Sequence, residues 1–262
     1  MSYLKELVNS QSMLFQLVKN DFKAKYLGSY LGMFWAFINP IITILVFWIV
    51  FQFGFRSMPV GDYPYVVWLI SGIIVWFFFS ESLGSGTHSI VDNSFLVKKV
   101  SFRVSYLPVI KILSGLIIHL FFIIAAFIIV WSYGYEPTLH LLQVFYYLIS
   151  VIILLLGLTW LTSSIYVFFR DTSQIISIII SLGFWLTPVF WTFSMVPEKY
   201  QIFFRINPMI YIVEGYRSSF LYHQWFWEDI PSLIMFWGEV AVIFLLGVFV
   251  FKRLRTQFSD VI

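Results

Sequence analysis

The sequence predicts an all-α integral membrane protein with six transmembrane helices, forming a single transmembrane domain over residues 1–262. Hydrophobic residues make up 60% of the chain and charged residues 11%, which differs greatly from the composition of a soluble domain. A helix that crosses a ~30 Å hydrocarbon core needs about 20 apolar residues, and helices satisfy their own backbone groups in lipid. Continuous apolar runs argue against a β-barrel, whose strands alternate in short segments. Six runs are long enough, at about Leu31–Phe55, Pro64–Leu83, Leu107–Trp131, Leu141–Phe169, Thr172–Met195 and Pro231–Phe251.

Basic residues predict which side of the membrane the termini occupy. Six spans put both termini on the same side, and Lys and Arg near helix ends are retained in the cytoplasm. With cytoplasmic termini, 12 of the 16 Lys and Arg residues lie inside. The remaining four lie outside, namely Arg56, Lys199, Arg205 and Arg217. We therefore expect both termini in the cytoplasm.

The segment before the first span, residues 1–30, has the pattern of an amphipathic interface helix. At 3.6 residues per turn one face is apolar, with Leu14, Phe15, Val18, Phe22 and Tyr26. The opposite face is polar, with Gln16, Lys19, Asn20 and Lys23. This pattern predicts a helix in the plane of the lipid headgroups. A solvated helix packed on the protein is the alternative.

Residues 84–106 form a predicted cytoplasmic loop between the second and third spans. The loop carries Lys98, Lys99 and Arg103, and its apolar residues are too few to span a membrane. This combination favours a short helix that docks against a cytoplasmic partner. A basic loop on the membrane surface is the alternative.

Residues 199–227 form a predicted helical hairpin on the outer side, between the fifth and sixth spans. The segment is rich in aromatic residues and contains Asn207-Pro208. Proline disfavours helical conformation at the residue before it, so two short helices are expected to meet there. Apolar pieces of about a dozen residues are typical of re-entrant or interfacial elements.

Ionisable residues inside predicted spans are candidates for function, because burying them in lipid is costly. Glu81 is expected to close the second span, His119 to hydrogen-bond across two helices, and Glu239 to pack at a helix interface. Glu214 and Arg217 are three residues apart and can pair on one helix face. None of these residues forms a catalytic site. The chain has no Cys, which excludes disulfides and thiolate metal sites.

Four stretches of the sequence, in order, resemble the permease subunit of bacterial ABC exporters of polysaccharides, the family of O-antigen, capsule and teichoic-acid exporters. The first is residues 20–35 followed by Asn39-Pro40, the second is residues 93–102, and the third is Phe169-Arg-Asp-Thr172. The fourth comprises Leu186-Thr-Pro-Val-Phe190, Met195-Val-Pro-Glu-Lys199, Asn207-Pro-Met209 and Glu214-Gly-Tyr-Arg217. Arg103 stands where the family often has proline.

The resemblance implies a non-catalytic subunit of the bacterial inner membrane that pairs as a homodimer with two copies of a separate ATPase. ATP and Mg²⁺ would bind to that ATPase, and this chain would hold no cofactor or metal. The absence of a Gly-x-x-x-x-Gly-Lys-Ser/Thr loop is consistent with this division. The implied substrate is a lipid-linked polysaccharide such as an O-antigen, surrounded by membrane lipids and with no nucleic-acid partner.

The resemblance also assigns roles to residues. Those expected to couple to the ATPase are Asn93, Lys98, Lys99, Phe102 and Arg103. Arg170 and Asp171 form a cytoplasmic turn, where a local salt bridge and helix cap is an equal alternative. The candidate channel aromatics are Trp35, Phe37, Trp76, Phe184, Trp185 and Phe190. The candidate outer gate consists of Tyr200, Asn207, Pro208, Glu214, Tyr216 and Arg217.

Aromatic residues make up 22% of the chain, which suits a path for sugars because aromatic faces stack on sugar rings. Interfacial belts and core packing explain aromatic residues equally well. The main alternative function is an ABC exporter of drugs or small lipids. A proton-driven carrier would need essential acids within the spans, and a membrane glycosyltransferase would need a polar catalytic cluster that no segment offers.

Overall fold

The computed structural model describes residues 2–25, 32, 34–54, 59–98 and 102–262, with side chains from residue 13 onward. The predicted all-α class is confirmed, since no strand occurs in this part of the chain. The helices that form the bundle are α2 (Phe34–Ile49), α3 (Tyr65–Asp92), α5 (Tyr106–Ser132), α6 (Gln143–Phe168), α7 (Thr172–Leu186) and α10 (Ile230–Leu254). The shorter or peripheral helices are α1 (Ser2–Ala24), α4 (Ser94–Val97), α8 (Glu198–Arg205), α9 (Pro208–Arg217) and α11 (Phe258–Val261).

Five of the six predicted spans form helices long and apolar enough to cross a membrane, within Phe34–Gly54, Tyr65–Asp92, Tyr106–Ser132, Leu139–Phe168 and Ile230–Val261. The remaining one, predicted over Thr172–Met195, forms α7 with 15 residues. At 1.5 Å per residue α7 is about 22 Å long. The helix ends because Thr187 precedes Pro188 and is extended, with ψ 135°.

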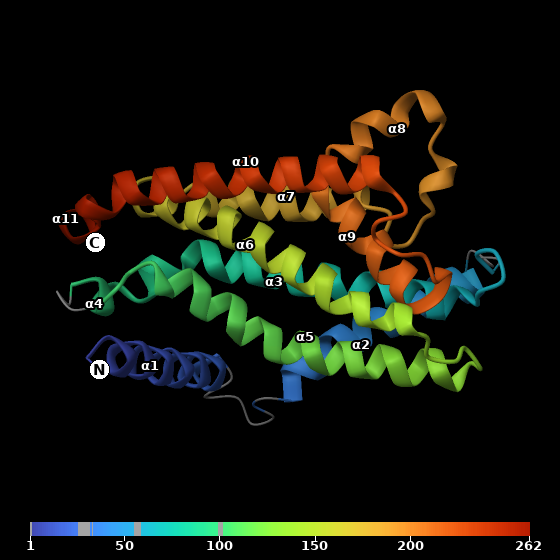
Figure 1. Ribbon diagram of the computed structural model, residues 1–262, viewed down its shortest axis with the longest axis horizontal. Helices are drawn as coiled ribbons and strands as arrows, with labels where there is room; N and C mark the ends of the chain where they lie inside the picture. The colour runs from blue at the N-terminus through green and yellow to red at the C-terminus, as the bar shows by residue number, and fades with distance from the viewer. Residues whose placement is uncertain (1, 26–31, 33, 55–58, 99–101) are drawn as a thin grey trace.

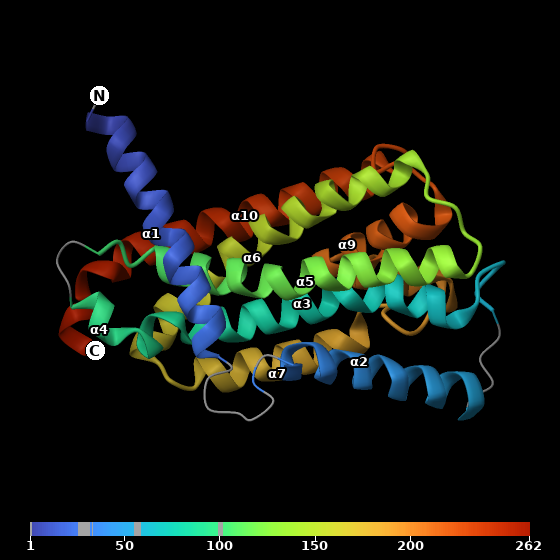
Figure 2. The same ribbon diagram turned by 90° about the horizontal axis from the view of Figure 1, so that it is seen from below.

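The helices form an elongated bundle with two distinct ends (Figure 1). The two termini, α4 and α11 lie at one end, which we call the terminal end. Helices α8 and α9 lie at the other, which we call the hairpin end. Helix α3 runs through the centre of the bundle, and most of its side chains are buried against α5, α6, α7 and α9. Helices α2 and α7 run along one side of the bundle, as Figure 2 shows.

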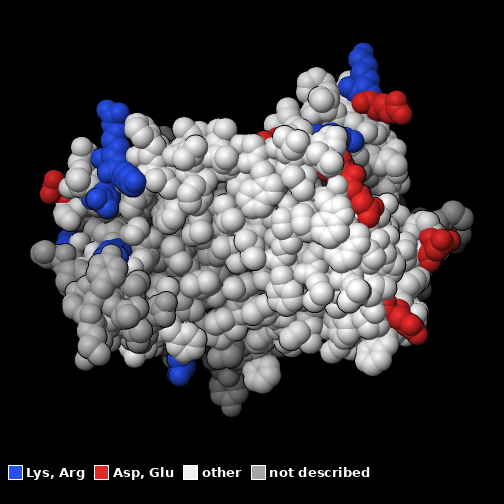
Figure 3. All heavy atoms as spheres, viewed as in Figure 1, with Lys and Arg blue, Asp and Glu red and all other residues white. Residues whose placement is uncertain are grey.

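Charged side chains are distributed unevenly between the two ends (Figure 3). Lys and Arg gather mainly at the terminal end, and Asp and Glu mainly at the hairpin end. The last turn of α10 contributes Lys252 and Arg253 to the basic end. The wide surface between the two ends is almost free of charge in this view, as expected for a surface in contact with lipid.

Helix α3 is longer than the predicted second span, and residues 84–92 belong to it and not to a loop. The prediction of a loop from Gly84 was wrong for these nine residues. No proline interrupts them, and Ser85 and Thr87 donate their hydroxyls to the carbonyl oxygens of Glu81 and Leu83, both at 2.8 Å. Thr87 also donates to Thr162 Oγ1 of α6 at 2.9 Å, and Ile90 is buried, so packing against neighbouring helices keeps this stretch helical. Glu81 therefore lies inside α3 and not at its end.

Helix α1 packs across α5 at the terminal end and then leans away from the bundle (Figure 2). Val18 and Phe22 are buried, as the predicted apolar face requires. Phe15, on the same predicted apolar face, is 71% exposed and is not packed against the protein. Tyr26 lies outside the described residues.

Helices α6 and α10 cross at a pair of glycines. A Cβ atom on Gly247 would lie 2.2 Å from the carbonyl oxygen of Gly157. A Cβ atom on Gly157 would lie 2.8 Å from Cα of Phe244. Small residues let helix backbones approach closely in membranes, so these two positions fix the spacing of the two helices.

Gly247→Ala should therefore lower the melting temperature, because the added methyl group meets backbone and forces the helices apart at a cost of about 1–3 kcal/mol. Gly238→Ala is the matched control on the same helix, since a Cβ atom there meets nothing within 4 Å. Thermal unfolding in detergent, followed by tryptophan fluorescence, measures both. Equal melting temperatures for the two variants would contradict the close contact of α6 and α10 at Gly157 and Gly247.

Candidate coupling, passage and gate sites

The hairpin end contains the predicted break between two short helices. Asn207 is extended between α8 and α9, and Pro208 is the first residue of α9. The Asn207 side chain accepts a hydrogen bond from the backbone N–H of Met209 at 3.1 Å, which caps α9. Its amide also donates to Thr187 Oγ1 at 2.8 Å, which ties the break to the end of α7. The prediction of two short helices meeting at this point is confirmed.

Helix α9 is buried inside the bundle and does not lie on its surface. Tyr216 is fully buried, and its hydroxyl lies 2.8 Å from Nε2 of His119 on α5. The predicted role of His119 as a tie between two helices is thus confirmed. Gly215 lies so close to α6 that a Cβ atom would meet the Tyr147 ring at 2.1 Å. Helix α8, by contrast, has no buried residue, and Tyr200 is exposed.

Arg217 is the most buried charge at the hairpin end, with no exposed side-chain surface. Its Nη1 donates to Glu214 Oε1 at 2.6 Å, which confirms the predicted pair. Its Nη2 donates to the carbonyl oxygen of Val189 at 2.7 Å, beyond the end of α7. The guanidinium carbon lies 3.5 Å from the ring centre of Trp68 on α3. Gly72 makes room, since a Cβ atom there would lie 2.8 Å from Nη2.

Three aromatic side chains near the start of α3 add hydrogen bonds to this arrangement. Tyr63 donates to the carbonyl oxygen of Leu221 at 2.7 Å, and Tyr65 donates to that of Phe190 at 3.0 Å. Trp68 Nε1 donates to the hydroxyl of Tyr222 at 2.7 Å. Burial raises the pKa of the Tyr63 phenol, and the nearby Tyr135 and Asp62 raise it further, so it remains a neutral donor. No pattern in the sequence predicts these hydrogen bonds.

Four of the six candidate channel aromatics lie together. Trp76 and Phe184 have ring centres 5.9 Å apart, Phe184 and Phe190 5.4 Å, and Trp185 and Phe190 4.9 Å. Phe47 and Phe51 from the α2 segment contact the same rings. We call these six residues the aromatic seam. Trp185 is 59% exposed and opens the seam to the surface that α2 and α7 share.

Trp35 and Phe37 lie apart from the aromatic seam, near the start of α2. Trp35 lines a cavity of about 340 Å³ between α2, α3 and α5, together with Asn39, Glu81 and His119. Phe37 packs edge-on against Phe121 of α5, with ring centres 4.6 Å apart. These two residues are therefore separate from the other four candidates.

The candidate coupling residues lie at the terminal end. Asn93 follows α3 and donates its side-chain amide to the carbonyl oxygen of Ser89 at 2.8 Å. Helix α4 then presents Phe95, which is 60% exposed, while Val97 is buried. Lys98 is exposed at its end, and Lys99 lies outside the described residues.

Phe102 and Arg103 lie just before α5, and Phe102 packs against the apolar cluster of the terminal end. Arg103 Nη1 lies 3.4 Å from the hydroxyl of Tyr106. The cluster joins α1, α3, α4, α5, α6, α10 and α11 through Val18, Ile90, Val97, Leu107, Ile110, Val167, Phe251 and Phe258. The cluster therefore links α4 to several helices of the bundle.

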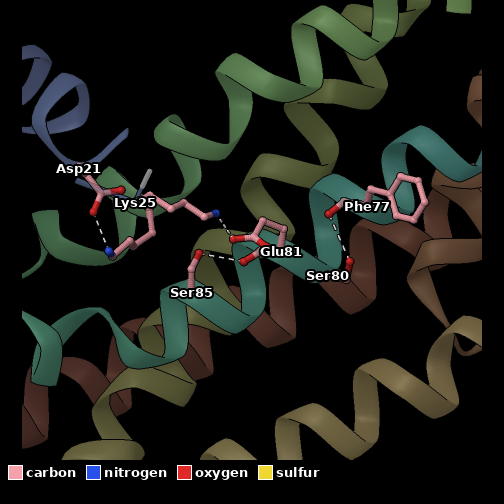
Figure 4. Close-up of polar contacts among 7 residues, drawn as sticks. Asp21, Lys25, Phe77, Ser80, Glu81 and Ser85 are labelled. Carbon is pink, nitrogen blue, oxygen red and sulfur yellow. Dashed lines mark hydrogen bonds and ion pairs between the residues drawn. The ribbon is translucent and has the colours of Figure 1, made fainter. Parts of the chain in front are cut away.

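Two ion pairs tie the end of α1 to the bundle (Figure 4). Lys111 on α5 donates to Asp21 Oδ1 at 2.6 Å. Lys25 pairs with Glu81 on α3. Glu81 was singled out from the sequence as an intramembrane acid, but its partner lies 56 residues away and was not foreseen.

Arg170 and Asp171 form the turn between α6 and α7. The Arg170 guanidinium lies 5.1 Å from the ring centre of Tyr166. Asp171 precedes α7, but its side chain makes no capping hydrogen bond. The helix-cap alternative is thus not seen at this turn.

Comparison with known proteins gives the family. A family model described as ABC-2 type transporter matches residues 13–221. The chain belongs to the ABC-2 type transporter family. This confirms the resemblance found in the sequence.

This ABC-2 transporter chain is similar to proteins named O-antigen export system permease protein RfbA. The relative from Myxococcus xanthus is 28% identical over 98% of both chains. Two from Klebsiella pneumoniae are each 26% identical over 95% of both chains. The similarity therefore extends beyond the region matched by the family model, through α10. The family is that of a transporter's membrane component.

In this ABC-2 transporter, Glu214→Gln should lower the melting temperature, because it leaves the buried Arg217 charge without its counter-charge. Removing one partner of a fully buried pair costs about 3–5 kcal/mol, and the cost here should be smaller because Glu214 is 33% exposed. The same change in an Arg217→Met background should cost much less, since the charge is already gone. A double-mutant cycle on thermal unfolding measures the coupling. If the two substitutions change the free energy of unfolding additively, the pairing is contradicted. Glu136→Gln, at an exposed residue, serves as the control.

Proposed function

We propose that this chain is the channel-forming subunit of an ATP-driven exporter that moves a lipid-linked polysaccharide, of the O-antigen kind, out of the cytoplasm. The observation that carries the proposal is the similarity to O-antigen export permeases over nearly the whole chain. The aromatic seam supports it, since aromatic faces stack on the apolar faces of sugar rings. We further propose that the protein resides in the bacterial inner membrane.

The working unit is a homodimer that binds two copies of a separate ATPase. ATP and Mg²⁺ bind to the ATPase, and this chain holds no cofactor. Support comes from the sequence, which has no phosphate-binding loop of the Gly-x-x-x-x-Gly-Lys-Ser/Thr type. The exposed apolar face of α2 and α7 is the proposed contact between the two copies, with the passage along the aromatic seam.

The chain crosses the membrane six times, with both termini in the cytoplasm. The gathering of Lys and Arg at the terminal end supports this orientation (Figure 3). Helix α7 supplies the additional crossing, since it runs along the bundle beside the longer helices and both termini lie at one end (Figure 1). Helix α1 lies at the headgroup level, with exposed Phe15 entering the lipid.

Force from the ATPase enters at α4. Asn93, Lys98, Lys99, Phe102 and Arg103 dock against the ATPase, with exposed Phe95 as a further apolar contact. Arg170 and Asp171 lie in the other turn at this end and contact the ATPase as well. The apolar cluster and the ion pairs of α1 carry the movement into the spans.

The hairpin of α8 and α9 acts as the outer gate, through Tyr200, Asn207, Pro208, Glu214, Tyr216 and Arg217. The two helices would contribute differently, because α8 is exposed and α9 is anchored by Arg217 and Tyr216. Movement of α8 against a fixed α9 would open the exit.

Deleting the gene should trap the polysaccharide inside the cell, because polymer synthesis continues without a path across the membrane. The measurement compares antibody-detectable glycan on intact cells with that released on lysis, and a plasmid copy of the gene should restore the surface signal. Normal surface glycan in the deletion strain would contradict the proposal and favour an exporter of drugs or small lipids.

A further inference from the structure

A cavity of about 510 Å³ opens at the hairpin end between α6, α9 and α10. Its volume falls within the ~300–1,000 Å³ range of small-molecule sites. Glu214 points toward it, whereas its partner Arg217 faces α3. The cavity therefore lies on the side of α9 that faces α6 and α10, apart from the aromatic seam.

Aromatic rings form much of the cavity wall, namely those of Tyr147, Phe193, Tyr211, Tyr222, Trp225, Phe226 and Phe236. Neighbouring rings hold several of them in fixed planes. Trp225 stacks on Trp227 with ring centres 4.6 Å apart, and Tyr211 stacks on Phe236 at the same distance. These neighbours, with His140 also 4.4 Å from the Trp225 ring, hold the rings in place. The wall therefore offers preformed apolar surface to the C–H groups of a pyranose ring.

Four carboxylates also line the cavity, and three of them have partners. Glu214 pairs with Arg217, Glu228 accepts from the backbone N–H of Trp225, and Asp229 accepts from that of Ser232. The fourth is Glu239 on α10, whose Oε2 is buried and has no hydrogen-bond partner in the described structure. Oε2 itself is enclosed, so a ligand would reach Glu239 through the part of its side chain that lines the cavity. A ligand that donates a hydrogen bond to this carboxylate would gain affinity, because no other donor offsets the cost of burying it.

From this geometry we propose that the cavity binds a neutral sugar residue of the exported chain, a second sugar site separate from the aromatic seam. One or two sugar hydroxyls donate to Glu239, and the ring stacks on the aromatic wall beside Trp225. The carboxylates exclude acidic sugars, since Arg205 is the only basic residue among the described lining residues. This inference rests on the proposed function, which supplies the glycan.

A metal ion and a lipid tail fit the cavity less well. The described residues contain no group of three or more His, Cys, Asp or Glu that could hold a metal ion. An acyl chain would leave the unpaired oxygen of Glu239 without a donor. A sugar residue satisfies both the carboxylate and the rings, and at the exit it would hold a segment that has just emerged.

The test measures binding by isothermal titration calorimetry with the purified protein in nanodiscs. The probe is the lipid-free oligosaccharide released by mild acid from the strain's own surface glycan. Glu239→Leu should weaken binding at least 10-fold while leaving the melting temperature equal or higher, because it removes an unpaired buried carboxyl. Trp225→Ala should weaken binding to a similar degree through loss of stacking. Trigalacturonate, an acidic probe, should not bind.

The matched controls are Glu136→Gln and Trp131→Ala, two exposed residues that do not line the cavity. Both should bind the probe with wild-type affinity. Wild-type affinity in Glu239→Leu and Trp225→Ala, or no binding by the wild-type protein, would overturn the inference.

If the deletion strain still traps its glycan while the cavity binds nothing, the export function stands and only the sugar site fails. Normal surface glycan in that strain would instead overturn the export function itself.

Discussion

A fully buried guanidinium, that of Arg217, is the constraint around which the hairpin end is organised. A buried charge is tolerated only where counter-charge and hydrogen bonds replace water, and Glu214 and the carbonyl oxygen of Val189 provide them. The ring of Trp68 covers the guanidinium, and the missing side chain of Gly72 leaves space for it. One side chain thus joins α9, α3 and the segment after α7. Because of this, α9 lies inside the bundle, and the two sides of α9 face different surroundings.

Those two sides divide the hairpin end into two regions with different chemistry. Toward α2 and α7, the aromatic seam is apolar and reaches the surface at Trp185. Toward α6 and α10, the cavity combines rings with carboxylates, including the unpaired Glu239. Glu214 belongs to the cavity wall and to the Arg217 pair at once, so a ligand in the cavity would touch the residue that anchors α9. The proposed passage and the proposed sugar site are therefore neighbours that share one ion pair.

The sequence predicted the features that depend on local pattern. Long apolar runs predicted six spans, and five of them form helices long enough to cross a membrane. Asn207-Pro208 predicted the break between α8 and α9, and spacing predicted the Glu214–Arg217 pair. Prediction from the sequence failed where tertiary contacts determine the length of a helix or the partner of a side chain. Helix α3 continues to Asp92 because its last turns pack against other helices, although these residues are too polar to be predicted as part of a span. Contacts across long separations, such as Lys111 with Asp21, leave no local pattern at all.

The most direct measurement of the central claim is reconstitution of this chain with its partner ATPase in proteoliposomes. A fluorescent lipid-linked oligosaccharide is placed in the outer leaflet, and only complexes whose ATPase subunits face outward can use added ATP. Transfer to the inside protects the fluorophore from a quencher that cannot cross the membrane. The account predicts that the fluorophore becomes protected from the quencher only when ATP is present. It also predicts that Lys98→Glu combined with Lys99→Glu removes transfer while ATP hydrolysis continues. Transfer without ATP, or no transfer by the wild-type complex, would contradict the account of this chain as a polysaccharide pathway driven by a separate ATPase.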